Sequence, residues 1–60
     1  MTRNIAQEIL MYRAKNNISQ GEMARRCNVT KQTIYSVENG YQNPSKLTEA
    51  KIRMVLDERS

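Results

Sequence analysis

The fold is decided by the stretch from Ile18 to Gly40, which reads ISQGEMARRCNVTKQTIYSVENG. Ser19 and Glu22 have the spacing of a capping box, in which the serine oxygen and the glutamate carboxylate each bind one free backbone amide. Asn28 suits the left-handed position of a tight turn, and Thr30 suits the N-terminal cap of the next segment. The stretch therefore predicts two short helices joined by a turn.

Apolar residues recur at helical spacing in both of these segments and define their inward faces. Met23 and Cys27 lie four residues apart, and the small Ala24 beside them allows the next helix to cross closely. Ile34 and Val37 form the inward face of the second helix. The remaining residues of its first turns are therefore expected to project outward, namely Lys31, Gln32, Tyr35 and Ser36.

A helix is also expected on each side of this pair. Before it, Ile5, Ile9 and Tyr12 form an apolar stripe, which Asn4 with Gln7 caps and which ends at the pair Asn16-Asn17. After it, Gly40 ends the preceding helix, and Pro44 and Ser45 signal a new start. The last helix is outlined by its apolar residues, which are Leu47, Ala50, Ile52, Met54, Val55 and Leu56.

The composition limits the class of protein. Sixty residues make a single domain, residues 1–60, whose small core makes a catalytic cavity improbable. Ten Lys and Arg against six Asp and Glu give a net charge of +4, which suits a polyanionic partner. Cys27 is the only cysteine and the chain has no His, so neither an internal disulfide nor a zinc site is expected.

The order of these segments resembles a known family. Ser19-Gln20, Val29 to Ile34, Glu38-Asn39-Gly40 and Asn43-Pro44-Ser45 are similar to motifs of phage repressor and Cro proteins, the lambda-repressor-like or XRE group of bacterial and phage regulators. The resemblance covers about residues 5–56. It implies an all-α, compact four-helix domain, or a truncated five-helix one, with a helix-turn-helix at residues 19–40.

The resemblance also implies which residues meet DNA. Gln20 matches a phosphate-contacting glutamine at the start of a helix, where free amides independently favour an anion. Lys31, Gln32, Thr33 and Ser36 match positions that meet base edges, and Thr30, Asn39 and Asn43 match positions that hold the sugar-phosphate backbone. Two tyrosines complete the candidate set because they lie beside these positions, namely Tyr35 and Tyr41.

The same resemblance implies a pair of oppositely charged residues, and the sequence departs from the family at two positions. Arg13 and Glu38 match an arginine and a glutamate that join the first and third helices, and the loss of either partner is expected to lower stability. Lys46 and Glu49 stand where the family usually has leucines. A homodimer on an inverted-repeat operator is therefore expected only if another apolar face replaces them, such as Leu47, Ala50 and Met54.

These observations favour a cytoplasmic, sequence-specific binder of double-stranded DNA, a small transcriptional regulator and a repressor in particular. The alternative is a protein-interaction module, such as an antitoxin-like subunit with secondary DNA binding, which would use Leu10, Met11 and Tyr35. No enzyme, cofactor, metal site, small-molecule ligand or membrane span is expected.

Overall fold

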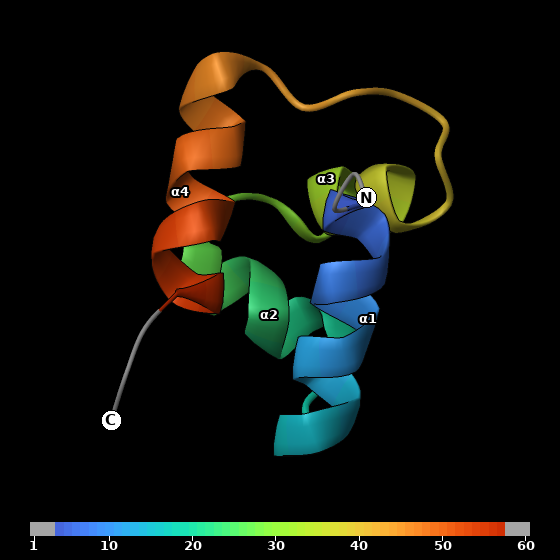
Figure 1. Ribbon diagram of the computed structural model, residues 1–60, viewed down its shortest axis with the longest axis vertical. Helices are drawn as coiled ribbons and strands as arrows, with labels where there is room; N and C mark the ends of the chain where they lie inside the picture. The colour runs from blue at the N-terminus through green and yellow to red at the C-terminus, as the bar shows by residue number, and fades with distance from the viewer. Residues whose placement is uncertain (1–3, 58–60) are drawn as a thin grey trace.

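A computed structural model describes residues 4–57, and this part of the chain is all-helical, as predicted. Its elements are α1 (Ile5–Asn16), α2 (Gln20–Cys27), α3 (Lys31–Glu38) and α4 (Lys46–Leu56). Figure 1 shows α1 and α4 on two sides of the molecule with α2 between them, and a long loop that runs from the end of α3 to α4. A short turn joins α2 and α3, and α3 packs against both α1 and α2.

Each helix begins at a polar cap. The side chains of Asn4, Ser19, Thr30 and Ser45 accept hydrogen bonds from backbone N–H groups of the first turn, at 2.9 to 3.2 Å. The other predicted contact of the capping box, from a free backbone amide to the carboxylate of Glu22, is wrong. This carboxylate instead accepts hydrogen bonds from two arginines of its own helix. The hydrogen bond from Arg26 is the main reason that the pKa of Glu22 is lowered.

Three residues with positive φ end the first three helices, as predicted: Asn17 (55°), Asn28 (58°) and Gly40 (72°). Each sits in the same double hydrogen-bond pattern, which satisfies two carbonyls that the helix leaves free. At the end of α3, the N–H of Gly40 bonds to the carbonyl of Val37 at 3.2 Å, and the N–H of Tyr41 bonds to that of Ser36 at 2.9 Å. These turns set the angles at which the helices follow one another.

The core joins all four helices and confirms the predicted inward faces of α1, α2 and α3. Its buried members are Ile9, Met23, Ala24, Cys27, Ile34, Val37 and Ile52. Burial raises the pKa of the Cys27 thiol, because a thiolate loses its hydration there. Cys27 therefore acts as a small hydrophobic residue of the core.

The apolar residues of α4 divide between the core and the surface. Ile52 is fully buried and Val55 and Leu56 pack partly against the core, whereas Leu47 and Met54 are 68% and 76% exposed. Ala50 is exposed as well. The helix ends at Leu56, with Asp57 as its C-terminal cap. A continuation of this helix as far as Ser60 was also expected, and residues 58–60 lie outside the described part of the chain.

Candidate nucleic-acid interface

The outward face of α3 begins at its N-terminus. Lys31, Gln32 and Tyr35 are exposed there, as predicted, because the buried Ile34 turns the opposite side of the helix inward. Together with Gln20 from the start of α2, these three side chains line an open hollow of about 480 Å³. The fold thus brings a lysine, two glutamines and a tyrosine from two helices to one surface.

Ser36 does not belong to this surface. The expectation that it projects outward is wrong, because the residue is only 8% exposed. The chain turns back at Gly40, and the N–H of Tyr41 bonds to the carbonyl of Ser36, so the segment after α3 lies against this turn of the helix. Ser36 is therefore not among the groups that α3 presents on its outward face.

Two threonines occupy the N-terminus of α3, where the cap fixes their hydroxyls. Thr30 Oγ1 accepts the N–H of Thr33 at 3.1 Å, and the two hydroxyl oxygens lie 2.9 Å apart. Thr33 is half-buried, while Thr30 is exposed. The hydroxyls of Thr30 and Thr33 are thus engaged with each other, and Thr30 is the more exposed of the two residues.

The two tyrosines of the candidate set lie together. The rings of Tyr35 on α3 and Tyr41 in the following loop have centroids 5.9 Å apart and are tilted by 59°, a favourable arrangement for an aromatic pair. Both residues are exposed. Tyr41 therefore supports the side of Tyr35 and extends the α3 surface toward the loop.

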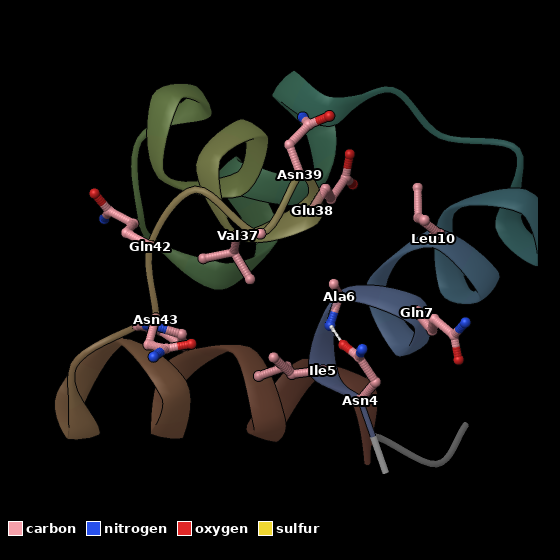
Figure 2. A pocket seen from close by; sticks show the side chains of 12 residues that line it. Asn4, Ile5, Ala6, Gln7, Leu10, Val37, Glu38, Asn39, Gln42 and Asn43 are labelled. Carbon is pink, nitrogen blue, oxygen red and sulfur yellow. Dashed lines mark hydrogen bonds between the residues drawn. The ribbon is translucent and has the colours of Figure 1, made fainter.

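Asn39 and Asn43 lie at a second hollow, of about 360 Å³, between the start of α1, the end of α3 and the loop before α4. In Figure 2, Ile5 and Val37 point into this hollow, while Asn39 points away from it. The side-chain N–H of Asn39 donates to the carbonyl of Tyr35 at 2.8 Å. The structure thus places the predicted backbone-holding asparagines beyond the end of α3, apart from the hollow at Gln20.

Beneath the α3 surface lies the predicted ion pair between α1 and α3. Arg13 Nη1 donates to both carboxylate oxygens of Glu38, at 3.0 and 2.9 Å, and Arg13 Nε donates to the carbonyl of Ile18 at 3.3 Å. The pair was predicted, but its third member was not: Gln20 Nε2 donates to Glu38 Oε1 at 2.8 Å. No local spacing signals this contact, because Gln20 and Glu38 are 18 residues apart in the chain.

The chemistry of these groups suits binding rather than catalysis. The surface offers amide, hydroxyl and ammonium donors, all of which can bind phosphate or base edges. Residues 4–57 hold no cluster of three or more His, Cys, Asp or Glu side chains that could bind a metal ion. Within the same residues, none of the helices is both long and apolar enough to span a membrane.

The fold and this surface define the class: a helix-turn-helix domain, with α2 and α3 as its two helices. A family model described as helix-turn-helix, of the Cro/C1 type, matches residues 9–58 of the 60-residue chain. The chain therefore belongs to this family, the XRE family of DNA-binding transcription regulators. Searches among curated proteins and among solved structures gave no match.

Proposed function

We propose that this chain recognises a particular sequence of double-stranded DNA and acts as a small transcriptional repressor in the cytoplasm. One observation carries the proposal: Lys31, Gln32 and Tyr35 are exposed along one side of α3 while Ile34 and Val37 are buried on the other. A helix held in this way can enter the major groove. Membership of a family of DNA-binding regulators supports the same conclusion.

The exposed groups have defined preferences for base edges. A lysine can donate to O6 and N7 of guanine, and a glutamine can pair with N6 and N7 of adenine, each such contact being worth about 1 to 3 kcal/mol of discrimination. We assign these roles to Lys31 and Gln32, respectively. The methyl group of the neighbouring Thr33 is assigned a contact with the methyl group of thymine. Phosphate contacts would come from Gln20, Thr30, Asn39 and Asn43.

The test is selection of duplexes from random DNA, followed by binding measurements at two salt concentrations. A preferred motif is expected, with an affinity that falls as salt rises because bound phosphates release counterions. In the double variant Lys31→Ala with Gln32→Ala, discrimination between the selected motif and a scrambled duplex should be lost. The exposed pair Lys15→Ala with Gln7→Ala on α1 is the matched control and should keep the motif.

We further propose that two copies bind an inverted repeat through α4. Leu47, Ala50 and Met54 lie on one stripe of α4, and all three are exposed. Lys46 at the start of the helix and Asp57 at its end would face each other in an antiparallel pair of α4 helices. Two-fold symmetry would then place the half-sites about 34 Å apart, one turn of the double helix.

A second candidate function is that of a protein-interaction module whose DNA contact is secondary. The observation in its favour is the exposure of Leu10 and Met11 on α1, since neither residue lines the hollow formed by Gln20, Lys31, Gln32 and Tyr35. The double variant Lys31→Ala with Gln32→Ala separates the two functions, because an interaction module would keep its main partner. A selection that returns no preferred duplex would favour this second candidate.

A further inference from the structure

Glu38 is shared by two helices besides its own. Its carboxylate accepts hydrogen bonds from Arg13 on α1 and from the side-chain amide of Gln20 at the first position of α2. The Glu38 side chain is only 4% exposed, and that of Arg13 is 23% exposed. The carboxylate thus lies behind the protein surface, whereas Gln20 reaches the hollow that Lys31, Gln32 and Tyr35 also line.

A carboxylate can only accept hydrogen bonds, so it decides which end of the Gln20 amide faces inward. The NH₂ group must point toward Glu38, and one of its two hydrogens is used there, at 2.8 Å. The other hydrogen is left for a group outside the protein. The contact also limits the rotamers of a side chain that would otherwise move freely at the start of a helix.

We propose that Glu38 is a positioning residue, which holds the amide of Gln20 so that its second N–H is presented to a DNA phosphate. This inference depends on the proposed function, because it concerns how the domain holds the DNA backbone. Glu38 lies at the C-terminal end of α3, so the contact also ties the register of the phosphate donor to that of the groove-reading helix. A shift of α3 relative to α2 would break it.

Arg13 makes this arrangement compatible with a polyanion. A lone carboxylate behind the interface would repel the phosphate that Gln20 is meant to bind. The guanidinium of Arg13 donates to both oxygens of Glu38 and offsets that charge. The ion pair therefore has a second purpose besides joining α1 to α3: it allows an acidic group to orient a phosphate-binding amide.

A double-mutant cycle on DNA affinity tests the proposal, with Gln20→Ala and Glu38→Gln as the single changes. In the wild-type background, Gln20→Ala should weaken binding by about tenfold, the effect of a hydrogen bond to a charged group. In the Glu38→Gln background it should cost no more than about twofold, because an amide at position 38 can donate as well as accept and no longer fixes which end of the Gln20 amide faces inward. Glu38→Gln also removes a negative charge. This change is present both with and without Gln20→Ala, so its effect on affinity cancels when the cost of Gln20→Ala in this background is calculated.

Two controls separate positioning from folding. Gln20→Ala leaves the Arg13–Glu38 pair in place, so its melting temperature should change little while its affinity falls. In the NMR spectrum of the free protein, the side-chain NH₂ resonances of Gln20 should shift in Glu38→Gln, whereas those of the exposed Gln7 should not. Gln7→Ala is the matched glutamine variant and should bind the selected duplex as the wild type does.

The outcomes distinguish this inference from the function on which it depends. If the wild-type chain binds no preferred duplex, both are overturned. If it binds a selected duplex but Gln20→Ala costs the same in both backgrounds, the DNA-binding function stands and the positioning role of Glu38 is wrong. Loss of sequence preference in Gln20→Ala would also contradict it, since a phosphate donor affects all duplexes alike.

Discussion

Single residues with left-handed backbone fix the ends of three helices, and Asn28 is the most consequential of them because it sits between α2 and α3. A residue with a Cβ and no short polar side chain pays about 1 kcal/mol or more in this conformation. Asn28→Ala should therefore lower the free energy of unfolding by about 1 kcal/mol, or roughly 4 to 8 °C in melting temperature. Asn28→Gly, measured beside it by thermal unfolding, should be close to neutral; equal losses in the two variants would contradict the argument.

Cys27 makes stability depend on pH. Its pKa is raised in the folded state by burial, so the folded chain stays protonated where the unfolded chain, with a thiol pKa of about 8.5, begins to ionise. The contribution of the neutral thiol to the free energy of unfolding is thus complete below about pH 8.5, and it is lost as the pH rises above this value. Urea unfolding between pH 7 and 10 should show a steeper loss for the wild type than for Cys27→Ala. Parallel curves would refute this.

Residues also show what the sequence can and cannot predict. The caps and left-handed turns follow from neighbours within three or four positions, so Ser19, Thr30 and Asn28 were placed correctly. The burial of Ser36 was not predicted, because it depends on tertiary packing that helix periodicity alone does not describe. The Gln20–Glu38 contact depends on the mutual placement of α2 and α3, so no spacing rule could have revealed it.

At the scale of elements, the packing of α2 is expected to depend on one small side chain. Ala24 is buried in the core, and we expect its methyl group to leave room for α3 to pack closely. Ala24→Leu should overpack this crossing and cost about 1 to 3 kcal/mol, together with a loss of DNA affinity because α3 is displaced. Ala14→Leu, at an exposed position of α1, is the matched control and should change neither thermal stability nor binding. An unchanged melting temperature in Ala24→Leu would mean that the crossing is not tight.

The elements differ in how well the sequence describes them. Strong caps and an apolar stripe define α1, α2 and α3, and the structure confirms their inward faces. For α4, the sequence places apolar residues on more than one side, and periodicity alone does not choose between them. Packing makes the choice: Ile52 lies against the other helices, and Leu47 and Met54 are left outside.

At the scale of the whole molecule, the exposed stripe of α4 is too small to hold two copies together on its own. Leu47, Ala50 and Met54 fall short of the roughly 800 Å² per partner that a standard interface covers. On DNA, however, two copies on adjacent half-sites are held close together, and a weak contact then gains from the high effective concentration. The proposed dimer should therefore form mainly on its operator, while the free chain is a monomer at low concentration.

The affinity for a single half-site and the cooperativity between two half-sites should therefore be separable. The double variant Leu47→Glu with Met54→Glu should bind a single half-site as the wild type does, but should lose cooperative binding to the inverted repeat, because two acidic stripes would face each other. Gel-shift titrations on duplexes with one and two half-sites measure both quantities. Met11→Glu is the matched control, since Met11 is 71% exposed on α1 and should not contribute. If the α4 variant kept its cooperativity while Met11→Glu lost it, the interface would lie on α1, and the two-fold arrangement would have to be rebuilt around that helix.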